Sequence, residues 1–134
     1  MSTLIVFDAS AIVGAALKRD GKPRQALLKA RREDVIALSS MVVAEIRSML
    51  ARPKFANALS DEDRTIVIAL ITDVAVWVEP IHRITDCRDE KDNKYLELAV
   101  AASAEIIVSS DDDLLALHPW REIRIVRPAG YLNG

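Results

Sequence analysis

Three consecutive aspartates at residues 111–113 are the part of this sequence best suited to chemistry. They follow an apolar run at residues 104–108, which we interpret as a strand, and precede a short helical pattern that ends near Leu117. Open α/β sheets bind their ligands at strand-to-helix corners of this kind. Neighbouring carboxylates repel one another by about 1 kcal/mol per close pair in water, so this corner favours a bound divalent cation.

Helix capping is the alternative explanation of these acids. Ser110 and Asp113 match the spacing of a capping box, and acids in the first turn of a helix complement its dipole. Capping accounts for Asp113 and Asp112, but one cap needs only one side chain. Asp111 is therefore the candidate metal ligand of this stretch, with capping as its alternative.

Asp8 is a second carboxylate at the end of a predicted strand. Residues 4–7 are uniformly apolar and rich in β-formers, which is typical of a strand buried on both faces of a parallel sheet. An unpaired charge is costly in such a place, which favours a functional role for Asp8 over a capping role. We expect Ser10 to cap the helix that follows and that ends near Lys18.

Glu45 and Asp92 are acids on predicted helices. Glu45 lies on or beside the face of its helix that packs inward, which a solubilising glutamate would avoid. An ion pair with Arg47 or Arg52 is the alternative. Asp92 lies at the mouth of a long apolar helix, and Asp89 precedes it by three residues. If one of these two aspartates is a cap, the other is left for a metal.

The alternation of elements predicts the fold. Helical patterns separate five apolar runs, at residues 4–7, 35–38, 74–78, 104–108 and 123–126. This order predicts a three-layer α/β/α fold with a central parallel sheet of about five strands. Residues 1–134 form a single domain, because no linker composition or internal repeat interrupts them. The carboxyl ends of parallel strands share one edge, so Asp8, Asp92 and Asp111 should meet in one cleft, with Glu45 pointing back over it.

Carboxylate oxygens in such a cleft suit Mg²⁺ or Mn²⁺. A metal of this kind activates water and stabilises charge on a phosphoryl group. The single cysteine, Cys87, and only two histidines argue against a cysteine and histidine zinc site. The sequence holds no phosphate-binding glycine loop or nucleophilic triad motif that would compete with the acidic site.

The composition is that of an ordinary soluble globular protein, with 51% hydrophobic and 28% charged residues. Aromatic residues make up only 4%, so contact with nucleic acid would rest on charge and pocket shape rather than on base stacking. The net charge of −2 is unevenly distributed, because residues 18–54 hold ten Lys or Arg against four Asp or Glu. This basic flank is compatible with binding a phosphate backbone and equally with a solvated helix face.

The compartment that we expect is the cytoplasm. The apolar run at residues 4–7 has no basic region before it and ends at Asp8, so it is not a signal peptide. No uninterrupted apolar stretch approaches the roughly 18 residues of a membrane span. The lone cysteine excludes an internal disulfide. We therefore expect a soluble protein without a membrane partner.

Four segments give the sequence a resemblance to a known family. They read VFDASAIV at residues 6–13, VAEIR at 43–47, CRDEKDNKYL at 87–96 and VSSDDDL at 108–114. In this order and spacing they resemble the PIN-domain family, and especially the VapC-type toxins of toxin–antitoxin pairs. The likeness runs nearly end to end.

The resemblance implies a metal-dependent ribonuclease that hydrolyses RNA phosphodiester bonds with an acidic quartet and Mg²⁺ or Mn²⁺. The quartet would be Asp8, Glu45, Asp92 and Asp111. Members of the family are often dimeric and often silenced by an antitoxin. The implied partners are therefore an RNA substrate, a cognate antitoxin and further copies of the chain in a homodimer or higher homo-oligomer.

Four further residues are secondary candidates for the same site. Ser10 stands where many relatives have Asn, and Ser109 stands where they often have Thr, so both keep a polar group near the metal. Asp89 and Asp113 are also similar to the family. Either aspartate would serve as a secondary ligand or orient its loop.

Other functional classes are alternatives to this interpretation. A haloacid-dehalogenase-like phosphatase also begins with a strand-end aspartate, but its chemistry wants a second acid two residues on, where this sequence has Ser10. A receiver-like regulatory domain would need a lysine that has no clear equivalent here. The remaining alternative is a catalytically silent PIN-like module that binds RNA or protein, and the presence of all four acids argues against it.

Overall fold

The centre of the molecule is a five-stranded, all-parallel sheet in the order β3-β2-β1-β4-β5. It is seen in a computed structural model that describes residues 3–134. The strands are β1 (Leu4–Phe7), β2 (Val35–Leu38), β3 (Val76–Trp77), β4 (Ile106–Val108) and β5 (Arg124–Val126). The predicted sheet is therefore confirmed.

Strand β3 is shorter than the predicted run at residues 74–78. It lies at the edge of the sheet and pairs only with β2, so one side of its backbone faces away from the sheet. Val76 and Trp77 are exposed. Natural proteins keep exposed edge strands short, because a long edge would pair with other chains.

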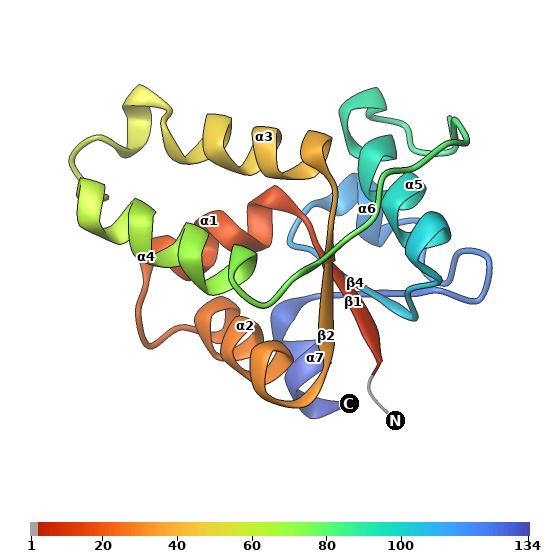
Figure 1. The fold of residues 1–134 in the computed structure, drawn as a ribbon, viewed down its shortest axis with the longest axis horizontal. Helices are drawn as coiled ribbons and strands as arrows, with labels where there is room; N and C mark the ends of the chain where they lie inside the picture. The colour runs from red at the N-terminus through yellow and green to blue at the C-terminus, as the bar shows by residue number, and fades with distance from the viewer. Residues whose placement is uncertain (1–2) are drawn as a thin grey trace.

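Helices cover both faces of the sheet. They are α1 (Ala9–Leu17), α2 (Lys22–Glu33), α3 (Ser40–Leu50), α4 (Asp61–Thr72), α5 (Asn93–Ala102), α6 (Asp112–Leu115) and α7 (Pro128–Asn133), with 3-10 turns η1 (Pro53–Phe55) and η2 (Glu90–Asp92). Helices α1, α2 and α4 pack against one another, whereas α5 packs on β1, β2 and β4. Figure 1 shows the strands between α1, α2 and α4 on the left and α5 and α6 on the right. The predicted three-layer arrangement is therefore confirmed.

The central strand β1 lies wholly inside the protein. Ile5 and Val6 are 0% exposed and Phe7 is 1% exposed, because β2 and β4 flank the strand and helices cover both of its faces. Burial of each side chain stabilises the fold by roughly 2 kcal/mol. The chain therefore leaves the sheet at Asp8 with a carboxylate that is already inside the protein.

Serine side chains cap two of the helices. Ser39 caps α3 by accepting a hydrogen bond from the backbone N–H of Val42 at 3.2 Å. Ser60 and Asp63 form a capping box at the start of α4. Both serines satisfy N–H groups that the first turn of a helix leaves without partners.

The two caps predicted beside the acidic residues are wrong. Asp8, not Ser10, caps α1, because its side chain accepts from the N–H of Ala11 at 2.9 Å. Asp111 caps α6 by accepting from the N–H of Asp113 at 2.8 Å, so no capping box joins Ser110 to Asp113. Both helices begin directly after an aspartate with extended backbone, which places Ser10 inside the first turn and Ser110 outside the helix.

Helix α7 follows the last predicted strand and is a feature that the sequence analysis did not predict. Pro128 opens this helix, where a missing backbone N–H costs nothing. Tyr131 packs edge-on against Phe7 at 6.3 Å between ring centroids, so α7 covers the end of the core. Within residues 3–134, no helix is both long and apolar enough to cross a membrane.

Candidate metal centre

The carboxyl ends of β1 and β4 bring the first acidic residues together. Phe7 pairs with Val108 in the parallel register, so Asp8 and Ser109, the residues that follow them, lie at the same edge of the sheet. Asp111 lies two residues beyond Ser109. Asp92 ends η2 at the start of α5, which packs on β1 and β4.

Asp8 is a buried carboxylate held by several donors. The residue is only 2% exposed to solvent. The hydroxyl of Ser10 donates to both carboxylate oxygens, at 2.7 and 2.9 Å, and the hydroxyl of Ser109 donates to Oδ2. Burial nevertheless raises the pKa of Asp8 to about 6, and the charge of Asp111 raises it further against these hydrogen bonds.

The same two serines tie the loop after β4 to Asp8. Ser109 accepts a hydrogen bond from the N–H of Asp111 at 2.9 Å, and Ser10 accepts one from the N–H of Ser110 at 3.0 Å. Each hydroxyl therefore donates to the carboxylate of Asp8 while it accepts from the loop. The secondary candidates Ser10 and Ser109 lie where they orient Asp8 relative to Asp111.

Asp92 is the least satisfied carboxylate of the site. Its residue is 8% exposed, and its Oδ2 has no hydrogen-bond partner among residues 3–134. Burial raises the pKa of Asp92 to about 7, and the negative charges of Asp111, Asp89 and Asp8 add to this effect. A buried carboxylate oxygen without a donor is costly, so this atom is suited to a positively charged ligand.

Asp89 and Asp113 also lie close to Asp92. One carboxylate oxygen from each of Asp89, Asp92 and Asp113 lies within 4.8 Å of the others, a group that does not include the oxygens of Asp8 or Asp111. The sequence left open which of Asp89 and Asp92 acts as a helix cap. The structure shows that it is Asp89, whose side chain accepts from the N–H of Lys91 at 3.1 Å and caps η2. The structure thus brings both secondary aspartates next to Asp92.

Asp113 already contacts a cation from the protein. The guanidinium of Arg88 donates to its Oδ1, with Nε at 3.0 Å, and the Arg88 side chain is largely exposed. Arg88 precedes Asp89 in the chain and therefore reaches the cluster from its solvent side. It partly neutralises Asp113 and would compete there with a bound metal.

Glu45 is half-buried on α3. It forms no ion pair with Arg47 or Arg52 within the part of the chain that the structure describes. Its negative charge, after burial and the charge of Asp8, is one cause of the raised pKa of Tyr95. Glu45 therefore lies near enough to Tyr95 for its charge to act on that residue.

The sequence analysis missed residues that hold this centre in place. The hydroxyl oxygen of Tyr95 accepts from the N–H of Ala9 at 3.2 Å, which joins α5 to the start of α1 beside Asp8. Asn93 accepts from the N–H of Cys87 at 2.8 Å and fixes the loop that carries Asp89. Both lie in the segment CRDEKDNKYL, but only the folded chain shows which backbone groups they contact.

The donor set fits a hard divalent cation such as Mg²⁺ or Mn²⁺. The ligands on offer are carboxylate oxygens, which are the groups these ions prefer. The unpartnered Oδ2 of Asp92 and the close carboxylates of Asp89 and Asp113 are the features of this structure that indicate such an ion. Asp8 and Asp111 lie near enough to influence the charge of Asp92.

Comparison with known sequences identifies the family. The sequence model of the PIN domain matches residues 4–113, a span that includes all eight candidate site residues. The chain belongs to the PIN-domain family. This PIN domain is 29% identical over 115 residues to the uncharacterized protein MJ1680 of Methanocaldococcus jannaschii. The aligned region covers 84% of this chain and 74% of that protein.

Two solved structures share the fold of this PIN domain. VapBC2 from Rickettsia felis, crystallised with a DNA fragment from its promoter, gives a TM-score of 0.61 at 14% identity, covering 91% of this chain and 96% of that one. PAE2754 from Pyrobaculum aerophilum gives a TM-score of 0.62 at 15% identity, covering 98% of this chain and 88% of that one. The likeness to both extends over nearly the whole domain.

Proposed function

We propose that this PIN domain is a metal-dependent endoribonuclease that hydrolyses RNA phosphodiester bonds. Asp8, Glu45, Asp92 and Asp111 would hold Mg²⁺ or Mn²⁺ and form its catalytic centre. The observation that carries the proposal is the buried Oδ2 of Asp92, which lacks a hydrogen-bond partner among the described residues and lies close to other negative charges. A divalent cation would supply the missing interaction.

The residues of the chain have distinct parts in this proposal. When bound, the metal would supply activation of water and stabilisation of charge on the phosphate. Ser10 and Ser109 hold the carboxylate of Asp8 in one orientation through their hydrogen bonds. Tyr95 is buried and accepts a hydrogen bond from the N–H of Ala9, so it holds the start of α1 next to Asp8. Asp89 and Asp113 would act as secondary ligands or orient Asp92.

The biological setting that we propose is the toxin half of a toxin–antitoxin pair. The four VapC-like segments support it, and the similarity in fold to VapBC2 is consistent with it. A cognate antitoxin would then bind the domain and silence it, and the domain would work as a homodimer or larger homo-oligomer. Its substrate would be cytoplasmic RNA.

The test of the proposed activity is cleavage of a mixed pool of RNA by the purified chain with Mn²⁺ or Mg²⁺. EDTA is expected to stop the reaction, and the Asp111→Asn variant is expected to be inactive. Asp112→Asn is the matched control, because Asp112 is the exposed neighbour of Asp111 and pairs with Arg127 on the surface. This control is expected to cleave like the wild type.

Two results would contradict the proposal. One is cleavage that persists in EDTA, since the acidic residues would then have no metal to hold. The other is equal cleavage by the Asp111→Asn and Asp112→Asn variants, which would indicate a contaminating nuclease. An inactive wild type that also fails to bind Mn²⁺ would favour the silent RNA-binding or protein-binding module instead.

A further inference from the structure

A groove lies beside the acidic centre, on the same edge of the sheet. Its volume is about 590 Å³, and it runs between the start of α3, the loop at residues 80–85 and the start of α5. Both α3 and this loop follow strands of the parallel sheet, β2 and β3, so the groove opens at the carboxyl ends of the strands. That edge is where α/β sheets bind their ligands.

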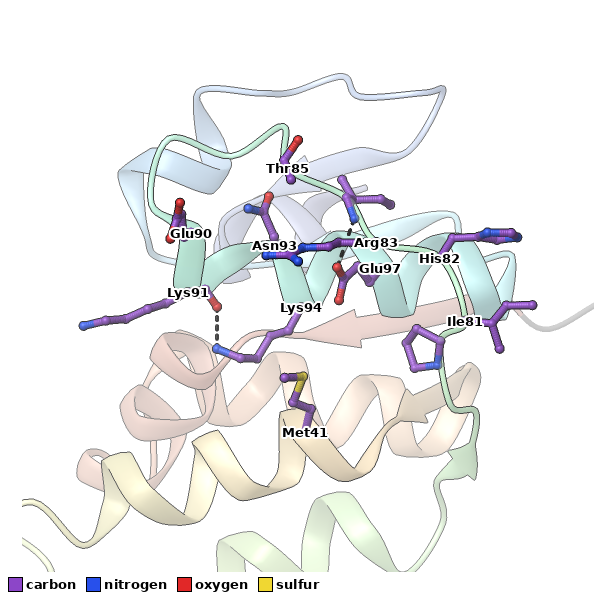
Figure 2. Close-up of a pocket in the computed structure, with 12 residues that line it drawn as sticks. Met41, Ile81, His82, Arg83, Thr85, Glu90, Lys91, Asn93, Lys94 and Glu97 are labelled. Atoms are coloured by element: carbon purple, nitrogen blue, oxygen red, sulfur yellow. Dashed lines mark hydrogen bonds between the residues drawn. The ribbon is translucent and has the colours of Figure 1, made fainter.

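Three cations line this groove. Lys91 and Lys94 come from η2 and α5, and Arg83 comes from the loop (Figure 2). The side chain of Lys91 extends outward at the rim of the groove, whereas its backbone oxygen faces Lys94 (Figure 2). Within residues 3–134, none of the three forms an ion pair with a carboxylate. The Nζ of Lys94 donates to the backbone oxygen of Lys91, which leaves its positive charge uncompensated.

Two carboxylates also line the groove, and in the described part of the chain neither forms an ion pair with these cations. Oε2 of Glu97 accepts a hydrogen bond from the N–H of Ile84 at 3.0 Å, so this side chain fastens the loop onto α5 (Figure 2). Glu90 is exposed and forms no ion pair in the described part of the chain. Three cations against two carboxylates give the groove and its rim a net charge of +1.

Residues 91–94 contribute side chains both to the groove and to the acidic centre. Asp92 lies between Lys91 and Lys94 in the sequence, and the positive charge of Lys94 acts on Asp92. A phosphate bound by these lysines would therefore lie next to the carboxylates. Met41 and Ile81, which are 61% and 88% exposed, give the same groove an apolar wall that a nucleobase can cover.

Five of the ten cations in the basic flank at residues 18–54 are engaged within the fold. Arg19, Arg31 and Arg32 are bound to the carboxylates of Asp63, Asp73 and Glu33. Arg24 and Lys29 donate to backbone oxygens of Ala15 and Tyr131. None of the ten flank cations lines the groove, so the cations beside Asp92 are the better candidates for contact with a substrate at the acidic centre because of their position.

We propose that this groove binds the sugar-phosphate backbone of single-stranded RNA where the strand enters the acidic centre, with Arg83, Lys91 and Lys94 contacting its phosphates. This inference deepens the proposed ribonuclease function and rests on it. A groove of about 590 Å³ is in the size range of pockets that hold small ligands and accepts one or two nucleotides rather than a duplex. Low aromatic content means that charge, not base stacking, carries the binding.

The test is the affinity for a fluorescein-labelled single-stranded RNA in EDTA, measured by fluorescence anisotropy over a series of salt concentrations. EDTA prevents metal-dependent hydrolysis, so the result does not depend on whether the chain cleaves RNA. The triple variant Arg83→Gln, Lys91→Gln, Lys94→Gln is expected to bind roughly tenfold more weakly at low salt. Its slope of log affinity against log salt is expected to be smaller than that of the wild type by about 2, at roughly 0.7 per lost phosphate contact on a single strand.

A matched control carries the same loss of charge on other surfaces of the molecule. Lys18, Lys22 and Lys54 are exposed and lie outside the groove. The variant Lys18→Gln, Lys22→Gln, Lys54→Gln is expected to keep the wild-type affinity and salt slope. Thermal unfolding of both triple variants checks that each is folded.

Two outcomes would overturn the inference. In one, both triple variants lose affinity equally, which would show a general effect of net charge. In the other, the groove variant binds RNA like the wild type while sedimentation shows that it has lost a wild-type dimer, and the groove would then be an interface between two copies. Either outcome leaves the metal-dependent cleavage assay as a separate test of the proposed function.

Discussion

The hydroxyl of Ser109 donates a hydrogen bond to Oδ2 of Asp8, although 101 residues separate them in the chain. The same hydroxyl accepts from the N–H of Asp111, so a single buried side chain joins the ends of β1 and β4. Ser10 repeats this pattern from the other side of Asp8. The acidic centre is thus built on hydrogen bonds that hold two strand ends in register.

Removal of the Ser109 hydroxyl is expected to weaken this arrangement. The Ser109→Ala variant leaves the buried Asp8 with one donor fewer and the N–H of Asp111 without its acceptor. We expect a loss of about 1–3 kcal/mol in the free energy of unfolding, together with weaker Mn²⁺ binding. Urea denaturation and calorimetry measure the two effects. Ser110→Ala, at the exposed neighbour, is the control, and equal losses in both variants would contradict the role given to Ser109.

The metal-free protein is expected to lose stability as the pH rises. The pKa values of Asp8 and Asp92, about 6 and about 7, lie above the ordinary 3.8. The folded state therefore binds more protons than the unfolded state from pH 3.8 up to these raised pKa values. The stabilisation is complete below about pH 4 and is lost as the pH rises through 6 and 7. The loss from Asp8 alone is on the order of 3 kcal/mol.

Urea denaturation in EDTA at a series of pH values measures this loss. The double variant Asp8→Asn, Asp92→Asn is the control and is expected to show a much flatter profile between about pH 5 and pH 7.5. If the free energy of unfolding of the wild type rose with pH across this range, the result would contradict the account in which these carboxylates are buried without a neutralising cation.

Asp111 caps α6, so its capping role has to be separated from its proposed role as a metal ligand. Asparagine is an equally good cap, whereas alanine loses the cap at a cost of about 1 kcal/mol. We expect Asp111→Asn to lose metal-dependent cleavage with no loss of stability, and Asp111→Ala to lose both. Cleavage rates and urea denaturation measure the two properties. A fully active Asp111→Asn variant would show that Asp111 serves only as a cap.

Arg88 is expected to limit metal binding through its contact with Asp113. The Arg88→Gln variant removes this competing cation, so the Mn²⁺ affinity at neutral pH is expected to rise a few-fold. Arg127→Gln is the matched control, because Arg127 pairs with the neighbouring surface residue Asp112. A fall in Mn²⁺ affinity in Arg88→Gln would mean that Arg88 positions Asp113 rather than competes for it.

Most of the fold could be predicted from the sequence because its signals are local. The apolar run at residues 4–7 reads as a buried strand, and β1 is buried on both faces. The alternation of apolar runs with helical patterns predicted a parallel sheet, and the five strands pair in parallel. Strand β3 was predicted too long, since a local pattern does not show that a strand lies at a sheet edge with exposed side chains.

The details of the site could not be predicted in the same way. Asp8 and Asp111 were treated as either caps or ligands, whereas in the structure each caps a helix and also lies in the acidic centre. The contact of Arg88 with Asp113 and that of Tyr95 with Ala9 join segments far apart in the chain. Such pairs are set by the packing of α5 and α6 at the sheet edge, which no single segment encodes.

The most direct test of the central claim is a calorimetric titration of Mn²⁺ into the full chain at about pH 7.5, where Asp92 is largely ionised. The wild type and the surface control Asp112→Asn are expected to bind Mn²⁺ with equal affinity, and Asp92→Asn is expected to show no binding. Equal binding by Asp92→Asn and the wild type would contradict the account, because the buried oxygen of Asp92 would then have no part in holding the metal.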